Sequence, residues 1–185
     1  ALRRLRERFP ESHLTLVSPS KLGGLWMGHP DLDELMTFER DDGVWSVSRQ
    51  ISSGRFDLAV ILPNSPRSAL ECLLAGVPRR VGRRWPWRNW MLTDPLTPPT
   101  HAVVMQKRTA EDIRSRVTSS SAIADPDPDP RAHQMHHYLD IVAALGADPS
   151  PLPPRLAVSG AEVEAVRRKH GFHPGSSWLG INAGA

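Results

Sequence analysis

Short apolar runs alternate along this 185-residue chain with segments in which apolar residues recur every three or four positions. The runs have the length of strands, and the segments have the period of amphipathic helices. Strands separated by helices are typical of βαβ units, in which the strands run parallel within a sheet. We therefore predict an α/β fold with a parallel sheet.

The predicted elements cover most of the chain. Helices are expected over 2–9, 22–27, 45–52, 66–75, 131–145 and 160–170, and strands over 13–17, 34–38, 57–62, 77–82 and 177–182. The run 58–62 is apolar at every position, as expected for a central strand covered by helices on both faces. Ser65 as N-cap, Pro66 at the first helical position and Gly76 just past the end bound the helix after this strand.

Breaks in the pattern predict the domain organisation. Residues 1–146 form a first domain, whose stretch 94–130 is rich in proline and serine and is expected to be an irregular surface excursion. Residues 147–158 read as a stiff, proline-rich linker. Residues 159–185 begin a second domain, with a capping box between Ser159 and Glu162 at the start of its helix.

Both ends of the chain interrupt a predicted element. Ala1 already lies within an amphipathic helical pattern, and the chain stops at a small-residue turn directly after the expected strand 177–182. We therefore expect the sequence to be a fragment of a longer protein.

Composition excludes several classes of protein. The single cysteine, Cys72, cannot form an internal disulfide and is expected to be a buried hydrophobe in a protein from a reducing compartment. No apolar stretch approaches the roughly 20 residues that span a bilayer. The formal net charge is only +3, but most of the 23 basic residues are arginine, which binds carboxylates and phosphates through a two-point fork.

The strongest candidate site lies where the central strand ends. Ligands of open parallel sheets bind beyond the carboxyl ends of the strands. The turn Pro63-Asn64-Ser65 follows such a strand and opens a helix, whose free backbone N–H groups favour an anion. Arg67 and Ser68 can add donors, although plain helix capping explains Ser65 equally well.

An arginine and tryptophan run follows one unit later. Residues 79–90 contain five arginines, three tryptophans and no acidic residue. Such a run suits nucleic acid, an anionic sugar or a lipid headgroup, or is simply a solvated basic face.

Other signals for a ligand are weaker. His133, His136 and His137 lack the carboxylate or cysteine partners of a metal site. Neither a dinucleotide-binding loop nor a Walker-type phosphate loop is present in the sequence. We expect no metal and no cofactor.

Four stretches together resemble a known family. They read LAVILPNSPRSALECLLAGVPRRVGRR from Leu58, WRNWMLTD from Trp87, HQMHHYLDIVAALG from His133 and WLGINAGA from Trp178. In this order they resemble the ADP-heptose:lipopolysaccharide heptosyltransferases of glycosyltransferase family 9, nearest the heptosyltransferase II branch. The resemblance implies a GT-B fold, with an acceptor-binding Rossmann-like domain followed here by the first βα unit of the donor-binding domain.

The resemblance also implies an activity. The enzymes transfer L-glycero-D-manno-heptose from ADP-heptose to the inner core of lipopolysaccharide, by an inverting, metal-independent displacement. The implied partners are ADP-heptose and a Kdo-lipid A type acceptor, with no nucleic acid. The implied location is cytoplasmic, peripheral to the inner face of the inner membrane.

The same resemblance assigns site residues. Asn64, Ser65, Arg67, Arg83 and Arg88 would bind the acceptor, and Ala183, Gly184 and Ala185 would open the donor-phosphate loop. The general-base aspartate of the family would lie upstream of Ala1, so the chain by itself is expected to be inactive.

Two alternatives remain open at this stage. The chain could belong to another GT-B transferase or sugar-nucleotide epimerase, which would share the fold but not the substrate. It could also be a nucleic-acid binding module built on the arginine and tryptophan run.

Overall fold

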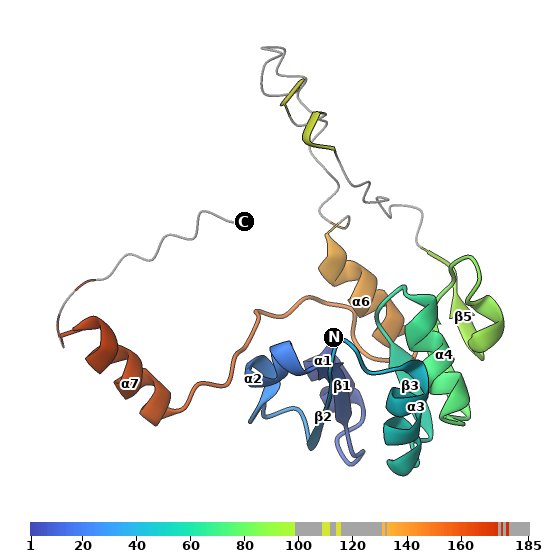
Figure 1. Ribbon diagram of the computed structural model, residues 1–185, viewed down its shortest axis with the longest axis horizontal. Helices are drawn as coiled ribbons and strands as arrows, with labels where there is room; N and C mark the ends of the chain where they lie inside the picture. The colour runs from blue at the N-terminus through green and yellow to red at the C-terminus, as the bar shows by residue number, and fades with distance from the viewer. Residues whose placement is uncertain are drawn as a thin grey trace.

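The computed structural model describes residues 1–98, 109–111, 114–115, 131, 133–173, 175 and 177. Figure 1 shows strands and helices packed into one body, from which a long connection leads to α7. The strands are β1 (Thr15–Pro19), β2 (Glu34–Phe38), β3 (Leu58–Ile61), β4 (Arg79–Arg83) and β5 (Asp94–Leu96). The helices are α1 (Leu2–Arg8), η1 (Ser20–Leu22), α2 (Gly23–Trp26), α3 (Val44–Ser53), α4 (Pro66–Leu74), η2 (Asn89–Met91), α6 (Gln134–Ala143) and α7 (Gly160–His170).

All paired strands in the described part of the chain run parallel. β1 pairs with β2 in one sheet, and a second sheet has the order β3-β4-β5. The helices between consecutive strands make the connections that parallel pairing requires. The predicted α/β class is therefore confirmed, with the strands divided between two sheets.

Helices cover both faces of the β3-β4-β5 sheet. Leu58 and Val60 of β3 pack toward α1 and α6, whereas Ala59 and Ile61 pack toward α3 and α4. Successive side chains of a strand point to opposite faces, so an apolar run without polar positions needs cover on both sides. The predicted cover on both faces of the strand at 58–62 is confirmed. Its predicted central position is wrong for the described sheet, because β3 pairs only with β4 and β4 lies in the middle.

One predicted irregular segment begins with a strand. The excursion was expected to start at Asp94, but β5 pairs with β4 there, with Gly82 opposite Pro95. The backbone N–H of Arg84 donates to Leu96 O at 2.8 Å. Among the described residues β5 has only one partner strand, so the missing N–H of Pro95 costs no ladder bond there. Much of the remaining excursion lies outside the described residues.

The ends of α4 follow the predicted pattern. The backbone N–H of Arg67 donates to Ser65 Oγ at 3.1 Å, and Pro66 occupies the first helical position. Gly76 follows the helix with φ +76°, a conformation that glycine adopts without steric cost. These caps place the start of α4 directly beside the end of β3.

Helix α7 begins as predicted, but its apolar side chains are exposed. Ser159 and Glu162 form a reciprocal capping box, and Gly171 ends the helix in the left-handed conformation. Val163 and Val166, which an amphipathic helix would bury, are exposed. The strand expected over 177–182 lies outside the described residues except for Ser177.

Candidate acceptor-side edge of the sheets

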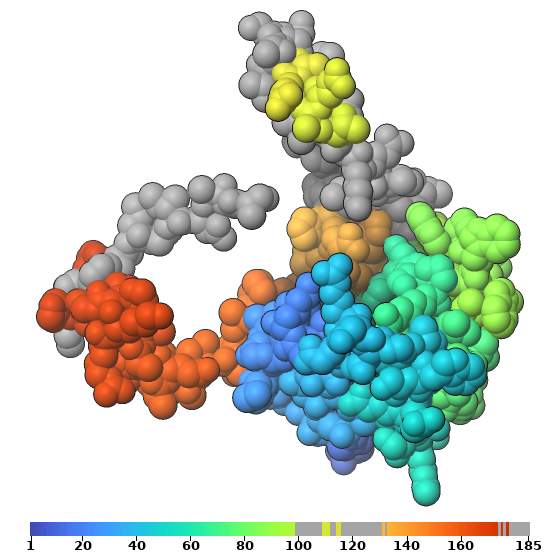
Figure 2. Space-filling model, viewed as in Figure 1, coloured from blue at the N-terminus to red at the C-terminus, as the bar shows by residue number. Residues whose placement is uncertain are grey.

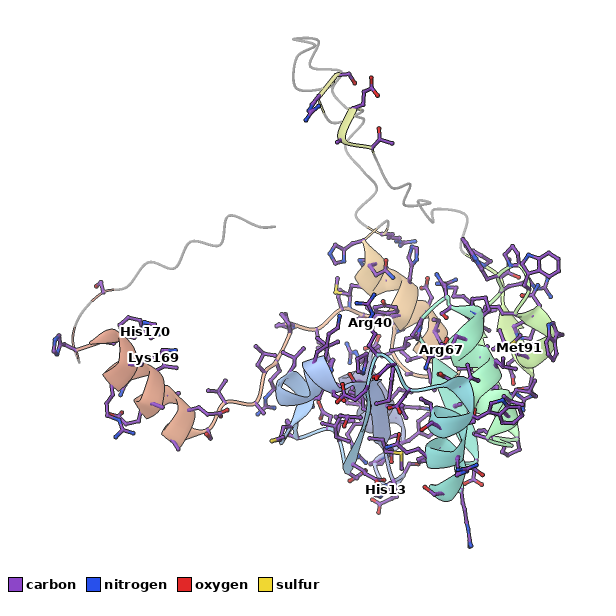
Figure 3. The ribbon with its side chains drawn as sticks, viewed as in Figure 1. His13, Arg40, Arg67, Met91, Lys169 and His170 are labelled. Carbon is purple, nitrogen blue, oxygen red and sulfur yellow. The ribbon has the colours of Figure 1, made fainter. Side chains whose placement is uncertain are left out.

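Three turns meet at the carboxyl ends of the strands. Residues 39–43 follow β2, residues 62–65 follow β3, and residues 84–88 follow β4. Figure 3 labels Arg40, from the first of these turns, near Arg67 of α4, the helix that begins directly after the second turn. The carboxyl edge of a parallel sheet is where ligands of such folds bind.

Asn64 and Ser65 lie where the sequence placed them. Both residues are exposed in the turn between β3 and α4. Ser65 Oγ accepts the N–H of Arg67, and Ser68 Oγ donates to Ser65 O at 2.9 Å. The serines therefore serve the helix as capping residues, while the side chain of Asn64 stands beside the positive end of α4.

Arg67 connects α4 to the turn after β2. Its Nη2 donates to Asp42 O at 2.6 Å, and its Nε donates to Glu71 Oε1 at 2.6 Å. Glu71 is almost completely buried, so the ion pair compensates a carboxylate that burial would otherwise penalise. The third nitrogen of this partly exposed guanidinium, Nη1, can donate a hydrogen bond to a further anion.

Arg40 is a candidate that the sequence interpretation missed. It is exposed in the turn after β2, and the Arg67 contact to Asp42 O holds this turn against α4. The signal was available, because Arg40 lies only two residues after a predicted strand. Only the structure shows that this strand end lies beside the α4 amino terminus, since the two strands belong to different sheets.

Arg88, which the resemblance assigned to acceptor binding, is completely buried. Its relative exposure is 0%, and its Nη1 donates to Pro63 O at 2.6 Å. Nε and Nη2 are buried and have no hydrogen-bond partner among the described residues, and burial lowers the pKa of the guanidinium. Arg88 therefore supports the β3–α4 turn from beneath.

Arg83 is also buried within the chain. Its Nη2 donates to Asp140 Oδ2 at 2.8 Å and to His137 O at 3.2 Å, and its Nη1 donates to Thr97 O at 3.1 Å. The side chain therefore links the end of β4 to α6. As with Arg88, the structure provides internal partners for a residue that the resemblance assigned to the acceptor.

Two of the three remaining arginines of the run 79–90 also have partners within the chain. Arg79 pairs with Asp94 at 3.2 Å, and Arg80 donates to the backbone carbonyls of Val77 and Met91. Within the described region, Arg79 and Arg84 are the exposed members of the five, and of these two Arg84 makes no side-chain hydrogen bond or ion pair. Most arginines of the basic run therefore make hydrogen bonds or ion pairs within the chain around β4. Few of their charges are left to bind a ligand.

Other candidate groups have structural roles or lie outside the described residues. His133 is the N-cap of α6, with Nδ1 accepting the N–H of Met135 at 3.1 Å. Burial raises the pKa of the Cys72 thiol to about 11. No cluster of three metal-binding side chains occurs among the residues that the structure describes. The predicted donor-phosphate loop, Ala183 to Ala185, cannot be placed because it lies outside them.

Sequence comparison finds relatives over half of the chain. No family model matches it. It is 30% identical over 98 residues to lipopolysaccharide heptosyltransferase 2 of Escherichia coli K12, and 29% identical over 98 residues to that of Salmonella typhimurium LT2. In both cases the match covers 50% of this chain and 28% of the relative.

Fold comparison extends the likeness to nearly the whole chain. The structure of E. coli ADP-heptose lps heptosyltransferase II matches with a TM-score of 0.61 and 22% identity, over 94% of this chain and 46% of that one. The glycosyl transferase family 9 structure from Veillonella parvula matches with a TM-score of 0.66 and 18% identity, over 94% and 45%.

These matches test the predicted fold and the predicted family. The chain spans less than half the length of each solved structure that it matches. The predicted GT-B type of α/β fold is confirmed by the fold likeness, and the named relatives agree with the family expected from the motifs. The chain is therefore similar in sequence to lipopolysaccharide heptosyltransferase 2 over half of its length, and similar in fold to a glycosyl transferase family 9 structure over nearly all of it.

Proposed function

We propose that this chain is the acceptor-side half of a heptosyltransferase. The complete reaction would transfer L-glycero-D-manno-heptose from ADP-heptose to the inner core of lipopolysaccharide. An acceptor hydroxyl would attack the anomeric carbon, ADP would leave from the opposite side, and a base would take the hydroxyl proton. The observation that carries the proposal is the 98-residue alignment with lipopolysaccharide heptosyltransferase 2.

The carboxyl edge of the sheets supplies groups suited to such an acceptor. The exposed Arg40, the partly exposed Arg67 and the amino terminus of α4 attract the phosphates and carboxylates of a Kdo-containing saccharide. Asn64 and Ser65 flank this position and can contact sugar hydroxyls.

Arg83 and Arg88 contribute to this proposal in a changed role. Their buried hydrogen bonds hold the turns that carry the exposed groups, so we propose them as positioning residues. Ala183, Gly184 and Ala185 remain the proposed opening of the donor-phosphate loop, where small side chains would let the backbone approach a diphosphate.

The cellular setting belongs to the same proposal. An acceptor anchored in lipid would bring the enzyme to the cytoplasmic face of the inner membrane as a peripheral protein. None of the helices in the described part of the chain has the length and apolar composition needed to cross a bilayer. The displacement is proposed to proceed without a metal ion.

Acceptor binding tests the proposal directly. Calorimetry would measure binding of a delipidated Kdo-containing inner-core saccharide to the 185-residue chain and to the variants Arg40→Ala and Arg67→Ala. Arg49→Ala is the matched control, because Arg49 is exposed in the middle of α3 rather than at the carboxyl edge.

We expect saturable binding that both edge variants weaken by about tenfold, which corresponds to loss of roughly 1.4 kcal/mol of charge-assisted hydrogen bonding. Arg49→Ala should bind like the unchanged chain. Absence of binding, or equal weakening by the control, would contradict the assignment of the acceptor to this edge.

A further inference from the structure

Three large aromatic side chains project from one short turn. In residues 84–90, which we call the tryptophan turn, the exposed fractions are 44% for Trp85, 86% for Trp87 and 68% for Trp90. Tryptophan is among the side chains that proteins bury most fully on average, so three exposed in one turn call for a partner. In Figure 2 the light green segment containing this turn forms an outer edge of the molecule.

Hydrogen bonds and buried side chains anchor the tryptophan turn despite its exposure. Trp85 N–H donates to Asn89 Oδ1 at 2.9 Å, and Met91 N–H donates to Arg88 O at 2.9 Å. The fully buried Arg88 and the buried Met91 fix the turn to the core from within. A preorganised platform of this kind loses little conformational entropy on binding.

The backbone of the turn also departs from the usual conformation. Trp87 has φ +66°, in the left-handed region that favours glycine. Its side chain is the most exposed of the three, so packing of the Trp87 side chain in the core does not explain this backbone conformation. Backbone strain of this kind concentrates at functional sites.

The charges around the turn favour an anionic partner of low charge density. No acidic residue occurs between Arg79 and Thr93, and Arg84 is an exposed cation within the turn. Arg79, Arg83 and Arg88 are occupied by internal contacts. Nucleic acid binding depends on several free cations that neutralise phosphates, which this surface does not present.

We propose that Trp85, Trp87 and Trp90, together with Arg84, dock the chain onto an anionic lipid bilayer. Tryptophan prefers the headgroup region because its ring is apolar and its indole N–H is polar. The rings would enter the interface while the Arg84 guanidinium contacts lipid phosphates. Docking through this surface does not require a heptosyl acceptor. The docking proposal therefore stands independently of the proposed transferase function.

Vesicle binding tests the docking surface. Sedimentation with vesicles of phosphatidylcholine and phosphatidylglycerol gives the partition coefficient, and the tryptophan emission maximum reports transfer of indole out of water. The test variant is Trp87→Ser combined with Trp90→Ser. The matched control is Trp45→Ser, since Trp45 is similarly exposed but lies in the first turn of α3.

We expect the unchanged chain to partition onto these vesicles with a blue-shifted emission. The double variant should partition at least about tenfold more weakly, and Trp45→Ser should behave like the unchanged chain. Circular dichroism should show that the variants keep their fold, because the replaced side chains are exposed.

Several results would overturn the proposal. They are absence of partitioning, unchanged partitioning of the double variant, and an equal loss in Trp45→Ser. Binding of a single-stranded oligonucleotide that only the double variant loses would assign the turn to nucleic acid instead. Because these vesicles contain no inner-core saccharide, the result is independent of the acceptor-binding experiment.

Discussion

The guanidinium of Arg88 donates from Nη1 to the carbonyl of Pro63 at 2.6 Å, although the side chain is completely excluded from solvent. Pro63 lies two residues after β3, in the turn that also carries Asn64 and Ser65. A buried arginine thus fixes the position of the strand end at the proposed acceptor edge. Its cost is the desolvation of a charge with two unpaired nitrogens.

Arg88→Ala should destabilise the chain strongly. The change leaves a cavity beneath the turn and an unpaired carbonyl at Pro63, so we expect a loss of about 3 kcal/mol in the free energy of unfolding. Urea denaturation measures the loss. Arg84→Ala, an exposed arginine of the same turn, is the control and should change stability by less than about 0.5 kcal/mol. Equal stability of the two variants would disprove the supporting role of Arg88.

Gly82→Ala should also destabilise, because of the same arginine. A Cβ at Gly82 would lie 2.9 Å from Arg88 Nη2 and 3.1 Å from Ile61 O, and the second neighbour is backbone that cannot move freely. We expect a loss of about 1–3 kcal/mol in unfolding free energy. Gly24→Ala is the control, since nothing lies within 4 Å of its Cβ position and alanine favours helix. A loss no larger than in the control would contradict the close packing around Arg88.

Asp33→Asn should reduce stability in a pH-dependent manner. The backbone N–H of Leu14 and the Arg6 guanidinium both donate to the Asp33 carboxylate, and they hold its pKa below the usual range. A lowered carboxyl pKa stabilises the folded state above the unfolded value of about 4, and this contribution disappears as the pH falls through the folded pKa. The asparagine side chain of the variant carries no charge at any pH, so it lacks this contribution throughout.

Thermal unfolding measured from pH 7 down to acid checks this prediction. The midpoint of Asp33→Asn should lie below that of the unchanged chain at pH 7, and the two should converge at low pH. Asp41→Asn, at an exposed position in the turn after β2, is the control and should follow the unchanged chain. A difference that persists at the lowest pH would show that the carboxylate charge is not responsible.

Cys72 should be unreactive in the folded chain. Burial raises the pKa of its thiol to about 11, so the thiolate that attacks thiol reagents is scarce at pH 8. We expect a chromogenic disulfide reagent to label the native chain at least about a hundredfold more slowly than the urea-unfolded chain. Similar rates in the two states would mean that the α4 packing around Cys72 opens readily.

Local patterns were enough to predict most elements. The β2 bounds agree with the predicted 34–38, and the caps of α4 and the Ser159–Glu162 capping box occur as expected. The hydrophobic period of an element, the cap residues of a helix and the glycine after its end all depend on residues close in sequence. They can therefore be identified without knowledge of the fold. The β5 strand was missed because Pro95 reads as a breaker unless the edge position of the strand is known.

What the sequence by itself determined is the α/β class, the strand ends where a site can form, and the residue types available there. Tertiary structure decided which of these residues face solvent. Arg83 and Arg88 looked equivalent to Arg84 in the sequence, yet only Arg84 is exposed. Their burial depends on Asp140 and Pro63, which lie 57 and 25 positions away along the chain. A charged side chain can be buried only where distant partners compensate its desolvation, and only the folded chain brings those partners together.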